Sequence, residues 1–447
     1  MVTKERIDIS FKGILNVALP IMLMGIAHNV INAADTAFMG RLGEIPIGAV
    51  GNGAMLYFIP VLVFMGLSLG GQIIIGRRNG EGNQGAIGHV FWQTLFAQSL
   101  LGILGFFTIF FYGEDLMHWI NGSEEIAAEA AKYLKIRAPG LIIVSIAIGF
   151  NAFYIGITKT RIVGIANAIM ATFNVGCNYV LVFGKFGFPA LGIEGAAWAS
   201  LISEVILLAA FILYLTFYTD TARFNIRKIS PPDWSMIFQI FKIGGPAMFQ
   251  GFITLGAWLT FFTLIEHLGT FELAVSHLVR VVYIFVIIPI FSLSDAASTL
   301  TSNLIGENRL SEIKSMVWKA ITIGWISNLL FFPFFVFYPE QLAMLFTDYE
   351  YLAEGTANIL RMMAGVSFIF TVSMILSKVI IGAGKTIQAF YLELLTVVIY
   401  FVYIYVVIER MKSSLLISWT SEFIYFGFML ILSALYLKYG KWKDAEV

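Results

Sequence analysis

The chain has 447 residues, of which 59% are hydrophobic and 13% are charged; its mean hydropathy is +0.84 and its formal net charge is zero. Soluble domains carry about twice that charged fraction, so the composition indicates a polytopic membrane protein. A neutral chain gives no electrostatic reason to expect a nucleic-acid partner. The single cysteine, Cys177, excludes an internal disulfide and a cysteine-ligated metal.

Twelve apolar runs are long enough to cross a bilayer as helices of about 20 residues. In chain order they are expected near residues 13–38, 47–75, 88–112, 134–157, 162–184, 195–218, 240–265, 274–304, 317–338, 358–382, 387–408 and 414–437. The predicted fold class is therefore an all-α polytopic membrane protein with twelve transmembrane helices.

The second half of the sequence repeats the first with an offset of 226 residues. Pro20 recurs as Pro246, and the segment Ile155-Gly156-x-x-Lys159-Thr160 recurs as Ile381-Gly382-x-x-Lys385-Thr386. A constant offset over widely separated positions indicates an internal repeat of six spans.

Two copies of equal topology predict two six-helix bundles related by a pseudo-two-fold axis along the membrane normal, an arrangement that suits alternating access. We assign residues 1–222 to the N-terminal bundle and 223–447 to the C-terminal bundle, with the segment 218–238 as the linker. Basic residues are concentrated in the loops on the side of the N-terminus. We therefore expect a multi-pass protein of the plasma (inner) membrane with both termini in the cytoplasm, acting as a monomer.

The first span carries one carboxylate, Asp35. An aspartate inside a bilayer helix costs roughly 2.5–3.5 kcal/mol on insertion scales, and such residues usually face a cavity and have a function. His28 and Asn32 precede it by seven and three positions, so a helix places all three on one face. The alternative is a polar stripe that only packs against another helix through hydrogen bonds.

The sequence around Asp35 resembles a known family. Pro20, the run Asp35-Thr-Ala-Phe-Met-Gly-Arg-Leu-Gly43 and the run Gly66-Leu-Ser-x-Gly70 look like the multidrug and toxic compound extrusion (MATE) family. In the second half, Gly245-Pro246, Leu268-Gly269 and Leu273-Ala-Val-Ser-His277 are similar to the family's seventh and eighth helices. The resemblance covers nearly the whole chain. It implies secondary-active efflux of small organic, often cationic compounds, driven by inward movement of Na⁺ or H⁺.

The resemblance also implies a coupling site. It makes Asp35 a principal coupling residue, with Asn174 and Asn178 on the fifth span and Ser200 and the Ala196 carbonyl on the sixth as its companions. Carboxylate, amide, hydroxyl and carbonyl oxygens form a set fit for Na⁺. A proton on the same carboxylate is the open alternative, and interhelical hydrogen bonding is the alternative for the asparagines. Asn167 shares their helical face and is a possible supporting residue.

The second half departs from the family at two spans. Spans seven and ten of the chain lack the carboxylates that some family members have there. Unusual charges within other spans of this half include Arg280, Asp295, Lys378 and Glu393. We expect an internal ion-pair network among them, with substrate contact as the alternative and Asp295 as its foremost candidate.

Two glutamates and one tyrosine are further candidates. Glu204 and Glu422 occupy matched places in the last span of each half, which suggests one shared structural role. Tyr154 is a candidate for a cavity lining, where aromatic rings stack on flat cations.

Two other functions remain open. A lipid-linked precursor flippase of the same superfamily would need cationic cavity residues, and Arg280 and Lys378 are the central cations available. A membrane-embedded transferase would need a cluster of His, Asp or Arg at a loop–membrane boundary. The sequence has no Walker loop, no His-Glu-x-x-His and no Gly-x-Ser-x-Gly, so we expect neither an enzyme nor a cofactor.

Overall fold

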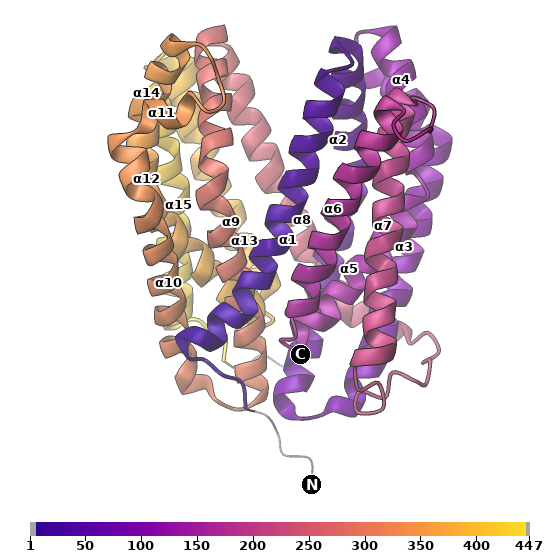
Figure 1. Ribbon diagram of the computed structural model, residues 1–447. Helices are drawn as coiled ribbons and strands as arrows, with labels where there is room; N and C mark the ends of the chain where they lie inside the picture. The colour runs from indigo at the N-terminus through magenta and orange to yellow at the C-terminus, as the bar shows by residue number, and fades with distance from the viewer. Residues whose placement is uncertain (1–5, 444–447) are drawn as a thin grey trace. The chain divides into compact units, whose positions relative to one another are not determined.

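The computed structural model describes residues 6–443, and within that range the chain forms helices and no strands (Figure 1). The helices of the first half are α1 (Phe11–Gly40), α2 (Glu44–Glu81), α3 (Gln84–Ile120), α4 (Glu124–Arg137), α5 (Gly140–Gly156), α6 (Arg161–Phe183) and α7 (Gly192–Tyr218). Those of the second half are α8 (Trp234–Glu266), α9 (Thr270–Gly306), α10 (Leu310–Phe337), α11 (Pro339–Ala343), α12 (Glu350–Gly382), α13 (Thr386–Ile404), the π-helix η1 (Tyr405–Arg410), α14 (Leu415–Trp419) and α15 (Ser421–Tyr439).

Eleven helical segments of the described chain are long and apolar enough to cross a membrane, with α13 and η1 counted as one segment and α14 and α15 as another. The pair α4 and α5 meets the same test together, across a bend of 53°. Pro139 stands at the bend, and its ring nitrogen cannot donate the hydrogen bond of a continuous helix. With this pair counted as one broken span the number is twelve, which confirms the predicted all-α fold.

The chain divides into two compact units. Residues Leu19–Met248 form the first, here called the N-terminal unit. The described residues up to Ala18 and those from Phe249 onward form the second, the C-terminal unit. Both boundaries lie inside helices, in α1 and α8, whereas the sequence-based boundary between residues 222 and 223 lies in the segment before α8. The assignment of bundles to 1–222 and 223–447 stays a prediction.

The segment expected to be a linker is fixed to α3 of the N-terminal unit. Trp92 Nε1 donates to the carbonyl of Ile226 over 2.9 Å, and Gln93 Nε2 donates to the carbonyl of Pro231 over 2.9 Å. The Gln93 Oε1 atom accepts a 2.8 Å hydrogen bond from the backbone N–H of Asp233. The chain therefore enters α8 from a defined position rather than from a free loop.

The internal repeat recurs as the same helix contact in both units. A Cβ on Gly156 of α5 would lie 3.0 Å from the carbonyl oxygen of Gln72 on α2. In the C-terminal unit, a Cβ on Gly382 of α12 would overlap the carbonyl oxygen of Ser298 on α9. Ser298 follows Gln72 by the same 226 positions by which Gly382 follows Gly156. Glycine is required at both places because the helix backbones approach too closely for any side chain.

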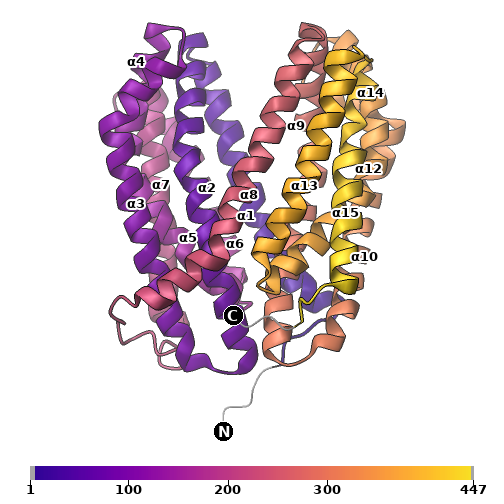
Figure 2. The same cartoon turned by 180° about the vertical axis from the view of Figure 1, so that it is seen from behind.

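Each unit buries an apolar core that contains tyrosines. In the N-terminal unit the core includes Tyr57 and Tyr133. In the C-terminal unit it includes Tyr283 and Tyr400, and Figure 2 shows α13 and α15 side by side there. Buried tyrosine hydroxyls need polar partners, and the carboxylates described below lie near these rings.

Candidate cation site

Asp35, Asn178, Asn174 and Ser200 form one hydrogen-bonded chain across three helices of the N-terminal unit. Asn178 Nδ2 on α6 donates to Oδ1 of Asp35 on α1 over 2.7 Å, and also to Oδ1 of Asn174 over 3.0 Å. Asn174 Nδ2 in turn donates to the Ser200 hydroxyl on α7 over 3.3 Å. The two asparagines lie one turn apart on the same face of α6, which is why both reach the neighbouring helices. The structure therefore brings these four predicted residues together.

The oxygens of this group suit a hard cation. Asn178 Oδ1 is buried and has no hydrogen-bond partner among the described residues, and an unpaired buried acceptor has a free-energy cost that a bound cation removes. Ala196, the fifth predicted member, is buried one turn before Ser200 on α7. No group of three or more His, Cys, Asp or Glu in the described chain could hold a metal ion. The donor set is thus one carboxylate with neutral oxygens, which fits Na⁺ chemistry or protonation of the carboxylate.

A second polar cluster lies beside this group. Arg137, at the end of α4, forms an ion pair of 3.0 Å with Glu204 on α7. The Tyr57 hydroxyl donates to the same carboxylate, 3.1 and 3.2 Å from its two oxygens. The Arg137 guanidinium lies 4.0 Å from the centre of the Tyr57 ring, a cation–π contact. All three side chains are buried.

The charge balance of the two clusters leaves Asp35 without an ion-pair partner. Arg137 is close enough to Asp35 for their charges to interact, but its guanidinium is paired with Glu204. Within residues 6–443 no basic side chain forms an ion pair with Asp35. An ionised carboxylate in a membrane helix is costly, so uptake of one cation is the favourable way to neutralise it.

Four other predicted residues lie outside the Asp35 group. Exposed His28 contacts the Met24 carbonyl of its own helix at 2.9 Å, and Asn32 is exposed as well. Asn167 is buried but donates back to the Val163 carbonyl over 2.8 Å. Tyr154 is fully buried among aromatic rings, and its hydroxyl lies 3.2 Å from that of Thr219. Within the described chain, no hydrogen bond joins any of these four to Asp35.

In the C-terminal unit the predicted ion-pair network is only partly present. Lys378 Nζ on α12 lies 2.6 Å from Asp295 Oδ1 on α9, so these two form the expected pair. Arg280 instead lies over the Phe262 ring at 5.4 Å, and it pairs with no acid of the described residues. Glu393 also pairs with no base there and is hydrogen-bonded to neutral groups. The network prediction is therefore wrong for Arg280 and Glu393.

Reasoning from the sequence did not single out Arg137, which it placed near the start of the span expected at residues 134–157. A signal was present: Ala127, Ala130, Leu134 and Arg137 follow helical spacing and are the buried face of α4. The shared role expected for Glu204 and Glu422 is also wrong. Glu204 pairs with Arg137, whereas Glu422 pairs with no basic side chain of residues 6–443.

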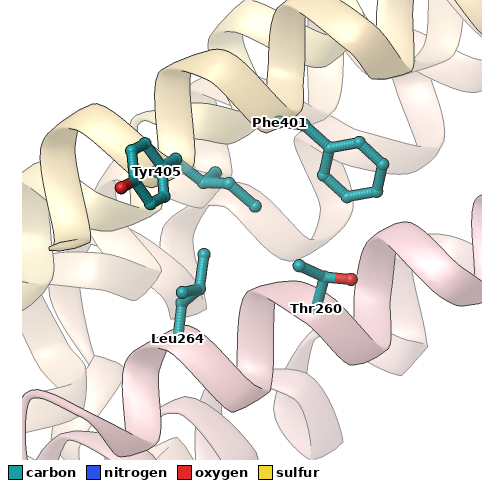
Figure 3. Close-up of a pocket in the computed structure, with 5 residues that line it drawn as sticks. Thr260, Leu264, Phe401 and Tyr405 are labelled. Atoms are coloured by element: carbon teal, nitrogen blue, oxygen red, sulfur yellow. The ribbon is translucent and has the colours of Figure 1, made fainter.

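A groove of about 360 Å³ in the C-terminal unit is apolar. Figure 3 shows Thr260 and Leu264 of α8 facing Phe401 and Tyr405 across it. The Thr260 hydroxyl donates to the Gly256 carbonyl of its own helix over 2.8 Å. Hydroxyl groups are the polar side-chain atoms of its lining, and none of the lining residues belongs to the Asp35 group.

Comparison with protein families gives the MatE model, which matches the chain twice, at residues 20–180 and 246–406. The two matches begin at Pro20 and Pro246, the positions that open the internal repeat. A protein of Thermotoga maritima named "Probable multidrug resistance protein NorM" is 26% identical over 99% of this chain and 96% of its own length. Another of Bacillus subtilis, "Probable multidrug resistance protein YoeA", is 23% identical over 75% of this chain and 73% of its own length.

Solved structures share the fold. One titled "Crystal structure of MATE in the straight conformation" has a TM-score of 0.87 at 20% identity and covers 96% of this chain and 95% of its own. Another, described as the outward-facing conformation of a multidrug resistance MATE family transporter, has a TM-score of 0.86 at 19% identity, with the same coverage. The family model matches most of the chain, in both halves and in the register of its repeat, and this chain therefore belongs to the MatE family, whose members are membrane transporters and not enzymes.

Proposed function

We propose that this transporter exports small organic compounds, cationic ones among them, in exchange for Na⁺ or H⁺ that enters the cell at Asp35. The observation that carries the proposal is a membrane carboxylate held by Asn178 and left without an ion-pair partner, since Arg137 is paired with Glu204. The names of the relatives support efflux of several drugs. No cofactor and no nucleic acid takes part in this proposal.

Binding of the cation changes the charge of the Asp35 group from negative to neutral. A ligand shifts a conformational equilibrium only by its difference in affinity for the two states, and a change of one full charge in a membrane helix supplies such a difference. Pro20 lies inside α1, the helix that carries Asp35, and a proline allows a helix to bend. Binding of the cation at Asp35 therefore changes the relative free energies of the bent and straight forms of α1.

The orientation and the oligomeric state belong to the same proposal. The basic loops support a cytoplasmic position for both termini, and the location that belongs to this proposal is the plasma membrane. A monomer suffices, because one chain contains the whole Asp35 group. A flippase for lipid-linked precursors has less support: of its two candidate cations, Lys378 is already paired with Asp295.

The test uses purified protein in proteoliposomes loaded with ethidium, with either a pH gradient or a Na⁺ gradient imposed. We expect one of the two gradients to drive export by the wild type. Asp35→Asn should reduce that export to the level of protein-free liposomes while the protein stays monodisperse. Glu114→Gln, which changes an exposed carboxylate on α3, is the matched control and should export normally. Unimpaired export by Asp35→Asn, or export that ignores both gradients, would refute the proposal.

A further inference from the structure

We propose that the C-terminal unit contains a proton-binding site of its own, in which Glu422 on α15 holds a proton and exchanges it with Glu393 on α13 through a cavity that fits one water molecule. This site is separate from the Asp35 group, and it does not depend on the proposed function.

Both carboxylates are buried without a counter-charge. Glu393 is 3% exposed and Glu422 is 6% exposed. Among the ion pairs of residues 6–443, none includes either side chain, in contrast to Glu204, which is paired with Arg137. Burying a lone ionised carboxylate is strongly unfavourable, and a bound proton removes that cost.

Glu393 is surrounded by hydrogen-bond donors. The Thr254 hydroxyl of α8 lies 3.1 Å from its Oε1 and shares its proton with the Gln250 carbonyl at 2.9 Å, and Gln250 Nε2 lies 3.4 Å from its Oε2. The Tyr425 hydroxyl of α15 also donates to Oε1. These contacts stabilise the ionised form of Glu393, so in the resting state the proton lies on Glu422 and Glu393 is the unprotonated acceptor.

Glu422 has the opposite environment. Its carboxylate accepts no hydrogen bond from the described residues and lines a small cavity of about 20 Å³. A cavity of roughly 10–15 Å³ is enough to hold one water molecule. Thr254 and Tyr425 line the same cavity, and both contact Glu393. A water molecule there would lie between Glu422 and the two hydroxyls that reach Glu393.

The surrounding titratable groups supply no competing positive charge. On α12, which also packs against α15, Lys378 is paired with Asp295 and Arg361 with Glu340. The titratable groups that face Glu422 are tyrosines, namely Tyr283 of α9, Tyr400 of α13 and Tyr425 of α15 itself, and Tyr425 also contacts Glu393 of α13. The Tyr283 hydroxyl is buried with no hydrogen-bond partner in the described chain, so the polar groups of this region are not satisfied by protein alone.

The lining favours a proton over a metal cation. Hard divalent cations take six or more oxygen ligands, while this cavity offers one carboxylate and three hydroxyls beside Ala257, Trp258 and Phe426. Two of those hydroxyls already contact Glu393. In the exchange, the O–H bond of protonated Glu422 breaks as the water takes the proton. A proton then passes through the Tyr425 or Thr254 hydroxyl, and an O–H bond forms on Glu393, so the water and the hydroxyl are unchanged.

The experiment is infrared difference spectroscopy of the full chain in lipid nanodiscs, between acidic and alkaline buffer, which detects the carbonyl band of buried protonated carboxyls. We expect Glu422→Gln to remove one such band, Glu422→Asp to shift it and Glu393→Gln to change the pH at which it appears. Glu354→Gln, an exposed carboxyl on α12, should leave the band unchanged. Asp35→Asn should also leave it in place, which separates this site from the proposed coupling site.

Two results would overturn the proposal. One is a set of bands that is identical in the wild type, Glu422→Gln and Glu393→Gln at every pH. The other is a band that responds to Na⁺ at constant pH and loses that response in Glu422→Gln, which would assign the site to a metal cation. Size-exclusion profiles of each variant show whether a lost band reflects unfolding, and Glu422→Asp keeps the test valid if Glu422→Gln does not fold.

Discussion

Asn178 Nδ2 donates hydrogen bonds both to Asp35, over 2.7 Å, and to Asn174, over 3.0 Å. The Asn178 amide nitrogen therefore links α6 to α1, while the oxygen of the same amide bonds to neither partner. That oxygen, Asn178 Oδ1, is buried and unpaired within the described residues. The residue at position 178 therefore sets the number of negative charges and of free oxygen atoms that the Asp35 group offers to a cation.

Asn178→Asp should tighten Na⁺ binding to the purified protein by at least about tenfold, or ~1.4 kcal/mol. The reason is that a second carboxylate near Asp35 adds Coulomb attraction of several kcal/mol at an effective dielectric constant of about 20. Isothermal titration calorimetry measures the change. Asn178→Leu, which removes the hydrogen bond without adding charge, should weaken binding; equal affinities in the two variants would contradict the role of Asn178.

Glu204→Gln should destabilise the N-terminal unit by about 3–5 kcal/mol, because it leaves the buried Arg137 guanidinium without its partner at 3.0 Å. Arg137→Gln/Glu204→Gln should lose clearly less than the sum of the two single variants, since neither charge then remains alone. Chemical unfolding in detergent gives the free energies for this double-mutant cycle. Strict additivity would show that the pair does not interact in the folded protein.

Gly382→Ala should destabilise the C-terminal unit by about 1–3 kcal/mol, because the new methyl group overlaps the Ser298 carbonyl of α9. Gly365→Ala on the same helix is the matched control, since a Cβ there meets nothing within 4 Å. It should cause no loss, because alanine is the better helix former. Thermal unfolding of both variants tests the prediction, and equal loss in both would mean that the close contact does not matter.

The Asp233 carboxylate should make the free energy of unfolding fall as the pH is lowered. Its Oδ1 caps α8 by accepting hydrogen bonds from the N–H groups of Ser235 and Met236, and Oδ2 lies 3.1 Å from His89 Nε2. These contacts, the Met236 bond first, hold the pKa of Asp233 below its usual value. A lowered pKa in the folded state stabilises the protein above the unfolded pKa of about 3.9, and this contribution is lost as the pH falls through the folded pKa.

Asp233→Asn should therefore lower the melting temperature at about pH 6 and lower it less at about pH 3, where the wild-type carboxyl is becoming protonated. The measurement is a series of melting curves in detergent over this pH range. Asp348→Asn, at an exposed loop position, serves as the control. A difference between Asp233→Asn and the wild type that stays constant with pH would contradict the capping role of the charge.

The helices and part of the candidate site could be predicted without coordinates. Apolar runs of membrane length are local features, and the bilayer requires every backbone group within it to be hydrogen-bonded, so such runs become helices. Asn174 and Asn178 share a face because they are four residues apart. Resemblance to the family supplied their partners, Asp35 and Ser200, and the structure joins the four by hydrogen bonds.

Hydropathy could not place the charged residues, because it averages over about 20 neighbours and carries no information on distant contacts. Arg137 lies in a segment rich in charged residues. In the folded protein it is on the buried face of α4, where its guanidinium pairs with Glu204, 67 positions away in the sequence.

The sequence by itself determined the class of this protein, its spans, its repeat and the helical face that carries the asparagines, since these depend on periodicity and spacing along one chain. Only the tertiary structure decided which charges are paired. It paired Glu204 with a guanidinium and, among the residues that the structure describes, left Asp35 and Glu422 without one, although Glu204 and Glu422 look equivalent in sequence. The physical reason is that ion pairing depends on distances of a few ångströms between separate helices, and those distances are set by helix packing.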